Sequence, residues 1–295
     1  MRLRNVWSVI LATDDQKGSG DLAAARQYLA PGGQPSLLQQ AVERGRALTD
    51  LPRISAVVRA EHRPFWEDQL DVLPREQIVV QPRDRGTAAA VLLPLLRIAQ
   101  KDPEAIVLTL PADHAIADQE VVIRAMEAAV EGVQCQPDKV VLLGMKPEDA
   151  GPEHSWVVPS RRKQATGTFL PVDSFIDRPS DRFAQIIYNR GGLWSSLIFA
   201  STVFNLLQIY QICLPELYRH FKPFVSEDPW NSRSLETLFR KAPPRDFSCD
   251  VLECCERLLG VIPVQPCGWT DFSHPGQWAV YQQSLAASGG AASLH

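Results

Sequence analysis

The sequence predicts an α/β protein in which helices cover a mostly parallel central sheet. Over the first 145 residues, short runs rich in Val, Ile and Leu alternate with segments of helical periodicity, as in a doubly wound sheet. Such branched apolar runs are typical of parallel strands buried on both faces. After Met145 the strand-like runs come closer together, which indicates antiparallel or mixed sheet. The expected strands of the first part are residues 6–12, 54–58, 77–80, 106–110 and 140–143.

Polar residues mark the starts of helices in this first part. Ser36 and Gln39 have the spacing of a capping box, which predicts a helix directly after Ser36. Thr87 is expected to cap a second helix that continues to about Gln100. Asp118 precedes a third periodic run and can cap it in the same way.

The second part of the chain has shorter elements that are punctuated by Pro and Gly. Ser180 is placed to start a helix that ends near Asn189, with Gly191 just beyond its end. The other expected elements are strands at residues 155–158, 172–176, 197–200 and 261–264, and helices at residues 203–212, 215–221 and 235–240.

The chain is expected to form one domain over residues 1–285, in halves at 1–145 and 146–285. The Ala, Ser and Gly tail at 286–295 is expected to be disordered. With a net charge of −4 and 45% apolar residues, the chain has no general attraction for nucleic acid or an anionic membrane. No apolar run approaches the ~18 residues of a membrane span.

The six cysteines show neither a Cys-x-x-Cys pair nor a His at zinc spacing. We therefore expect buried or surface thiols rather than disulfides or zinc, and a cytoplasmic protein. The apolar run at residues 6–12 is too short for a secretory signal and is interpreted as a first strand. The cysteines are Cys135, Cys213, Cys249, Cys254, Cys255 and Cys267.

The strand expected at residues 106–110 leads to a carboxylate. Pro111 has no N–H with which to continue a ladder, so the strand should stop there and Asp113 should lie at its carboxyl end. Ligands of open α/β sheets bind at that edge, and a carboxylate there can hold Mg²⁺ against phosphate oxygens. The alternative is that Asp113 caps the next helix, although Asp118 lies closer to it.

Two further segments suggest ligand chemistry. Arg83 and Arg85 lie in a loop between a strand and a helix start, where guanidinium and backbone N–H groups can face an anion. The alternative is a surface loop whose arginines pair with acids. Asp271 follows the strand at 261–264 and offers a second carboxylate for the same cation; its alternative is a turn residue in an aromatic corner.

Three of these segments resemble the motifs of sugar-nucleotide pyrophosphorylases, and most of all those of mannose-1-phosphate guanylyltransferases. They are Leu-Pro-Ala-Asp-His at 110–114, Pro-x-x-Arg-Gly-Thr-Ala at 82–88 and Gly-Trp-Thr-Asp at 268–271. Weaker similarity extends through residues 177–179, 193–199 and 246–253. The resemblance implies a Rossmann-like nucleotidyltransferase fold with a nucleotide-binding first half and a sugar-binding, mixed-sheet second half.

The resemblance also implies an activity, in which a nucleoside triphosphate reacts with a sugar 1-phosphate and pyrophosphate is released. The similarity to mannose-1-phosphate guanylyltransferases implies that the substrates are GTP and mannose 1-phosphate. It implies that Asp113 and Asp271 hold the Mg²⁺ cofactor and that Arg26 takes the place of a phosphate-binding Lys. It assigns Asp177, Arg178, Trp194 and Ser195 to the sugar phosphate. It assigns the nucleotide to Leu11, Ala12, Arg85, Gly86, Thr87, Pro111 and Ala112.

This chain departs from the family pattern at several places. The family's Gly-rich loop is replaced by a segment that contains Asp14 and Asp15, which should weaken triphosphate binding, with Lys17 and Arg26 in partial compensation. Ser195 replaces an Asn, and His-Ser-Trp at 154–156 stands where the family has Gly-Tyr-Gly or Gly-Tyr-Ile.

Two functions therefore remain open: an enzyme, or a family member that has lost catalysis and acts as a binding or regulatory subunit. In both, the partners are small molecules, and homo-oligomerisation is left open. His114 is expected to be a structural hydrogen-bonding group rather than a base. His62, His154 and His220 stand apart from any metal pattern in the sequence.

Overall fold

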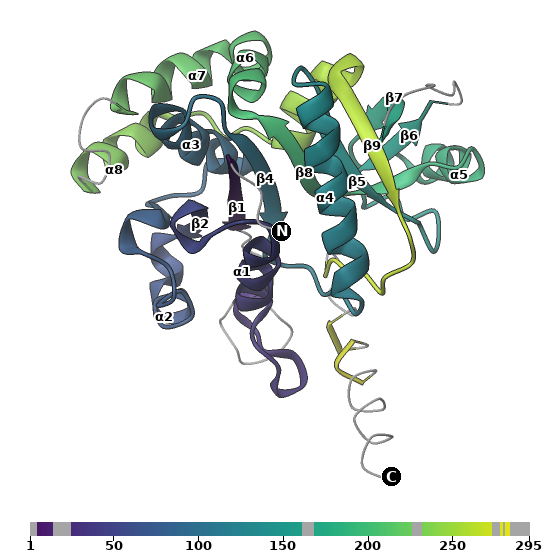
Figure 1. Cartoon of the computed structure of the whole chain (residues 1–295), viewed down its shortest axis with the longest axis horizontal. Helices are drawn as coiled ribbons and strands as arrows, with labels where there is room; N and C mark the ends of the chain where they lie inside the picture. The colour runs from purple at the N-terminus through teal and green to yellow at the C-terminus, as the bar shows by residue number, and fades with distance from the viewer. Residues whose placement is uncertain are drawn as a thin grey trace.

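The computed structural model describes residues 5–13, 25–160, 168–225, 232–272, 278–279 and 281–283. The segment with Asp14, Asp15 and Lys17 and the tail at 286–295 lie outside these residues. The described strands form one sheet in the order β3-β2-β1-β4-β8-β5-β9-β7-β6 (Figure 1). They are β1 (Val6–Ala12), β2 (Ile54–Arg59), β3 (Ile78–Gln81), β4 (Ile106–Pro111), β5 (Val140–Met145), β6 (Trp156–Pro159), β7 (Leu170–Ile176), β8 (Leu193–Thr202) and β9 (Leu259–Val264).

The sheet has a parallel part and a mixed part, as the sequence predicts. Strand β1 pairs in parallel with β2 and β4, and β2 pairs in parallel with β3. Strand β8 is antiparallel to both β4 and β5, so it joins the two parts. Beyond it, β9 is parallel to β5, whereas β7 and β6 are antiparallel additions. Because β1 and β4 run in the same direction, their carboxyl ends meet at one edge of the sheet.

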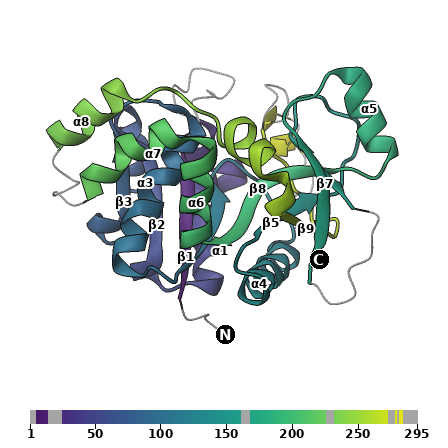
Figure 2. The same cartoon turned by 90° about the horizontal axis from the view of Figure 1, so that it is seen from above.

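Helices cover both faces of the sheet (Figures 1 and 2). Along β1, Val6 and Ile10 face a core shared with α1 and α4, whereas Trp7 and Val9 face a core shared with α3, α6 and α7. This alternation follows from the two-residue period of a strand. No described helix has the length and apolar character that crossing a bilayer requires. The helices are α1 (Leu37–Leu48), α2 (Arg63–Trp66), α3 (Gly86–Lys101), α4 (Gln119–Cys135), α5 (Asp181–Asn189), α6 (Val203–Cys213), α7 (Pro215–Phe221) and α8 (Ser232–Lys241).

Two of the three predicted helix caps are confirmed. The Ser36 hydroxyl accepts from the Gln39 N–H at 3.2 Å and the Ser36 N–H donates to the Gln39 side chain at 3.0 Å, which completes the capping box of α1. Asp118 accepts from the Val121 N–H and caps α4.

The predicted cap at Thr87 is wrong, because α3 begins one residue earlier, at Gly86, with Arg85 in the capping position. The Thr87 hydroxyl has a different role. It donates to Asp246 at 3.1 Å and accepts from the Phe247 N–H at 2.8 Å. These partners are distant in sequence, so local spacing could not reveal them.

The expectation that the cysteines form no disulfide is also wrong. Cys213 at the end of α6 and Cys254 in the short helical turn η8 (Glu253–Leu258) are bonded, with their Cα atoms 6.2 Å apart. The two cysteines are 41 residues apart, and this spacing matches no motif that would predict the bond from the sequence. Cys135 and Cys249 are exposed free thiols, and Cys255 and Cys267 are buried free thiols.

Cys255 should react far more slowly with iodoacetamide than Cys135. Burial raises the pKa of Cys255 to about 12, and the thiolate is the reactive form. Cys135, in contrast, is exposed. Timed alkylation of the native protein followed by peptide mass spectrometry measures both rates, and unfolding in urea should make them equal. Equal rates in the native protein would contradict the buried placement of Cys255.

Candidate functional site

The predicted nucleotide residues gather at the carboxyl edge of β1 and β4. Leu11 pairs with Pro111 in register, and Ala12 and Ala112 are buried directly beyond them. Leu11, Pro111, Gly86 and Thr87 line a cavity of about 280 Å³. The side chains of Asp113, Asp84 and Asp246 line it as well, and none of its described lining residues is cationic. A phosphate group would therefore need a counter-cation to enter this cavity.

The two predicted metal ligands are brought together by an antiparallel bridge. Ala115 and Thr270 exchange two backbone hydrogen bonds of 2.9 Å, which aligns the segment carrying Asp271 with the loop that follows β4. Burial, and then the charge of Asp271, raise the pKa of Asp113 to about 6. The two carboxylates are therefore close enough to repel each other, an arrangement that a bound cation relieves.

His154 contacts Asp271 directly, a tertiary contact that the spacing of residues in the sequence does not reveal. Its Nδ1 lies 3.1 Å from Oδ2 of Asp271, and its Nε2 lies 3.4 Å from Oε1 of Glu153. Burial opposes a charge on this ring, but the hydrogen bond to Asp271 and the charges of Asp271, Glu153 and Asp149 together raise its pKa. The signal in the sequence was the departure from the family pattern at 154–156.

Two buried guanidinium groups lie behind the carboxylates. The charges of Arg26 and Arg44 both lower the pKa of Asp113 and so oppose the effect of burial. Nη1 of Arg44 donates to Gln119 at 3.5 Å, while its Nε and Nη2 have no partner among the described residues. Burial lowers the pKa of Arg44 to about 10. Arg44 was not predicted from the sequence, although it lies on the apolar face of α1, three residues after Ala41.

His114 lies beside Asp113 but is not charged at neutral pH. Burial lowers the pKa of His114 to about 4, and its Nε2 is 3.7 Å from Oδ1 of Asp113. An imidazole with so low a pKa is a weak proton acceptor near pH 7. Nδ1 of His114 is buried without a hydrogen-bond partner among the described residues, so the expected hydrogen-bonding role is not observed there, and the ring packs edge-on against Trp269.

The arginines of the basic loop are held by α8. Nη2 of Arg83 lies 2.7 Å from Oε1 of Glu236. Arg85 donates from Nε to the carbonyl of Phe239 at 2.6 Å and from Nη2 to that of Arg240 at 3.3 Å. The contact of Arg83 is the one expected from the alternative interpretation, in which the arginines pair with acids, whereas Arg85 pairs with backbone carbonyls. An anion contact from Arg85 would need a rearrangement of this side chain.

Replacing Gly86 by Ala should lower the free energy of unfolding by at least about 1 kcal/mol. Gly86 has a φ of 77°, and a Cβ there would overlap the carbonyl of Arg245. Gly191 is a matched control, since its φ of 78° is similar but its Cβ would meet nothing within 4 Å. Urea denaturation of both Ala variants measures the difference, and equal losses would contradict the close approach at Gly86.

Three of the predicted sugar-phosphate residues share one neighbourhood through Ser155. The Ser155 hydroxyl donates to Asp177 at 2.5 Å, and the Ser155 carbonyl accepts from the Ser195 N–H at 2.8 Å. Trp194 precedes Ser195 on β8 and is buried. Arg178 has a left-handed φ of 42° and lies 3.0 Å from its neighbour Asp177, with its side chain 64% exposed.

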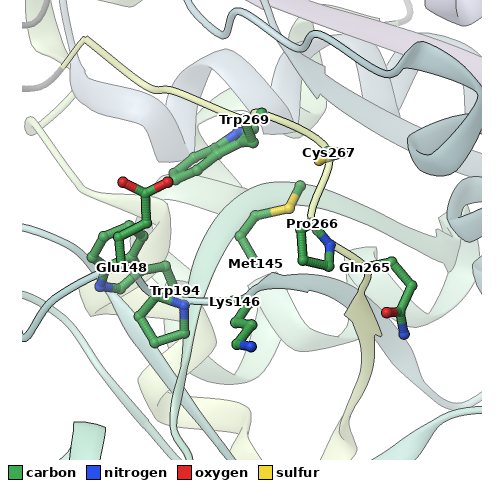
Figure 3. A pocket seen from close by; sticks show the side chains of 10 residues that line it. Met145, Lys146, Glu148, Trp194, Gln265, Pro266, Cys267 and Trp269 are labelled. Carbon is green, nitrogen blue, oxygen red and sulfur yellow. The ribbon is translucent and has the colours of Figure 1, made fainter.

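A pocket of about 260 Å³ adjoins this region (Figure 3). The indoles of Trp194 and Trp269 form part of its wall, together with the side chains of Lys146 and Glu148. Neither indole N–H has a partner among the described residues. The pocket therefore combines aromatic surface with polar groups that can bind a ligand, which is typical of small-molecule sites.

The residues present fit a Mg²⁺ ion. Asp113 and Asp271 provide hard oxygen donors, and Oδ2 of Asp271 is engaged with His154. No group of three or more His, Cys, Asp or Glu ligands exists in the described part of the chain. Two carboxylates are nevertheless enough, because Mg²⁺ completes its coordination with water and substrate phosphates.

Comparison of the sequence with models of protein families shows to which family the chain belongs. A model of the family described as Nucleotidyl transferase matches residues 22–209, which is more than half of the chain. The chain belongs to the nucleotidyl transferase family. Membership of the nucleotidyl transferases confirms the resemblance that the motifs carry.

Known relatives of this nucleotidyl transferase are longer than the chain. Alginate biosynthesis protein AlgA of Pseudomonas aeruginosa is 27% identical over 267 residues, which are 86% of this chain and 52% of that protein. Mannose-1-phosphate guanylyltransferase of Salmonella muenchen is 26% identical over 267 residues, with 86% and 53% covered. The chain thus spans about half the length of the curated relatives that it matches.

Solved structures confirm the predicted nucleotidyltransferase fold. One from Thermus thermophilus, described as a mannose-1-phosphate geranyltransferase, matches with a TM-score of 0.77 and 22% identity, over 90% of this chain and 76% of its own. One from Helicobacter pylori, described as a mannose-6-phosphate isomerase, matches with a TM-score of 0.72 and 16% identity, over 90% and 100%. At such identities the likeness concerns the fold alone.

Proposed function

We propose that this nucleotidyl transferase joins a nucleoside triphosphate to a sugar 1-phosphate and releases pyrophosphate. The observation that carries the proposal is the convergence of Asp113 and Asp271 at the carboxyl edge of the sheet, beside a cavity lined by acidic side chains. The names of the relatives favour GTP and mannose 1-phosphate as the substrates.

In the proposed reaction a phosphate oxygen of the sugar 1-phosphate attacks the α-phosphorus of the nucleotide. The new P–O bond forms as the bond from the α-phosphorus to the oxygen of the leaving pyrophosphate breaks, so no covalent enzyme intermediate is needed. The attacking phosphate is already ionised, and the reaction needs no strong base. A neutral His114 is compatible with this requirement.

The protein would supply charge and position rather than covalent chemistry. Asp113 and Asp271 would hold Mg²⁺, which when bound neutralises negative charge on the phosphates. The charges of Arg26 and Arg44 favour the ionised form of Asp113. The sugar phosphate would bind near Trp194, Ser195 and residues 177–178. Asp177 and Ser195 both hydrogen-bond to Ser155, so these residues lie in one neighbourhood.

The test is turnover by the purified protein with each nucleoside triphosphate, Mg²⁺ and mannose 1-phosphate, followed as release of pyrophosphate. We expect release with GTP above that with the other nucleotides. Release with none of the pairs would overturn the proposed reaction.

A binding or regulatory protein is the second candidate, and the engaged state of Arg83 and Arg85 favours it. Both guanidinium groups are occupied by α8 rather than turned to an anion. Calorimetric titration with GTP and with the sugar nucleotide distinguishes the two. Binding without turnover would support the second candidate over the first.

A further inference from the structure

We propose that His154 is a positioning residue that fixes the Asp271 carboxylate by a hydrogen bond, in an orientation suited to a divalent cation shared with Asp113. The inference rests on the proposed function, because it takes these two carboxylates as the cation ligands. It goes beyond that function by assigning a role to a side chain where the related motifs have a glycine.

The hydrogen bond between His154 and Asp271 is buried and well placed. The His154 side chain is 5% exposed, and Nδ1 donates to Oδ2 of Asp271 across 3.1 Å. A carboxylate bonded at one oxygen can no longer rotate freely about its terminal torsion. The plane of the carboxylate is therefore held in one orientation, which is what a cation with strict octahedral geometry requires of its ligands.

Aromatic side chains hold the imidazole ring in turn. The ring centroid of His154 lies 4.1 Å from that of Trp194 and 6.1 Å from that of Trp269. Trp156 packs edge-on against Trp194 at 6.1 Å and donates from its indole to the carbonyl of Gly151 at 3.1 Å. The loop that carries His154 is thus attached at both sides, and the ring cannot swing away from Asp271 without breaking this packing.

Repulsion between the two carboxylates explains why such a support is useful. The bridge between Ala115 and Thr270 brings the segments that carry Asp113 and Asp271 together, and two carboxylates held near each other repel when no cation lies between them. A fixed donor on Asp271 opposes movement of the two groups apart and keeps the pair ready for the ion. Partners that hydrogen-bond a metal ligand typically change metal affinity or activity by about 10- to 100-fold when they are removed.

Two substitutions of similar size separate this role from simple packing. In His154→Asn the side-chain nitrogen stands at the bond distance from the backbone at which Nδ1 stands in histidine. In His154→Gln the nitrogen stands one bond further out, near the place of Nε2. Only the Asn variant can rebuild the bond to Asp271, whereas both variants lose the same aromatic packing.

The measurement is binding of Mn²⁺ alone, followed by electron paramagnetic resonance of the free ion, with thermal unfolding of each variant alongside. We expect His154→Asn to stay within about threefold of the wild-type Kd and His154→Gln to weaken binding by about tenfold or more, at similar Tm. Equal affinities for all three proteins, or equal losses in both variants, would overturn the inference.

The same experiment keeps the inference apart from the proposed reaction. Asp271→Asn should weaken Mn²⁺ binding at least as much as His154→Gln, since it removes the carboxylate itself. A wild-type protein that binds no Mn²⁺ would overturn the role of His154. If pyrophosphate release is absent but the Asn and Gln variants differ as stated, the reaction falls and the positioning role stands.

Discussion

Replacing Asp113 or Asp271 by Asn should lower the rate of pyrophosphate release by about 10²- to 10⁴-fold. Each change removes one negative oxygen donor from a site that offers two, and Asn is nearly the same size, so packing is preserved. The effect should appear in kcat and in the Mg²⁺ concentration needed for half-maximal rate. Steady-state assays over a range of Mg²⁺ concentrations measure both.

Asp118→Asn is the matched control for this prediction. Asp118 follows Asp113 closely in the chain, but its carboxylate caps α4 by accepting from the Val121 N–H. Asn caps helices about as well as Asp, so both stability and turnover should stay near the wild-type values. If Asp113→Asn and Asp271→Asn also keep the wild-type rate, the assignment of the cation ligands is wrong.

Protonation of Asp113 should stabilise the metal-free protein as the pH falls from about 7 towards about 4, whereas His114, whose pKa is lowered to about 4 by burial, acts in the opposite direction over the same range. The pKa of this carboxyl is raised to about 6 in the folded protein, above its ordinary value, so the folded state binds the proton more tightly than the unfolded state. Protonation through this range should add about 1–3 kcal/mol to the free energy of unfolding. As the pH rises above the pKa that Asp113 has in the folded protein, this stabilisation is lost.

Denaturation with urea at several pH values, in the presence of a chelator, tests this expectation. Asp113→Asn cannot take up the proton, so acidification should stabilise the wild type relative to this variant, while the opposing effect of His114 is common to both proteins. Mg²⁺ at neutral pH should recover part of the difference for the wild type and none for the variant. Parallel curves for the two proteins would show that Asp113 is not perturbed.

Much of the fold could be predicted, because it depends on patterns that repeat locally. The apolar runs located β1, β2 and β4, and the capping residues located the start of α1 and of α4. The position of β8 between β4 and β5 could not be predicted in this way. Strand order depends on contacts between distant segments, and a run of apolar residues does not specify its neighbours.

The position of a candidate site residue could be predicted where that residue comes directly after a strand in the sequence. Asp113 could be placed because Pro111 ends β4, and Asp271 because its motif resembles that of a known family. The pairing of His154 with Asp271 could not be predicted, since it depends on a tertiary contact between the loop after β5 and the segment after β9. Arg85 shows the opposite case. The sequence predicted that its side chain faces an anion, but it donates to a backbone carbonyl of α8 instead.

Strand β8 has a consequence for motion in this protein. It pairs with β4 from Ile106 to Thr109 and with β5 from Val140 to Met145, with an irregularity in the β5 ladder between Leu142 and Gly144. The parallel part and the mixed part of the sheet cannot hinge against each other without breaking these pairings. The spacing between the sheet edge that carries Asp113 and the pocket beside Trp194 is therefore set by the sheet, and adjustment to a ligand must come from the connecting loops.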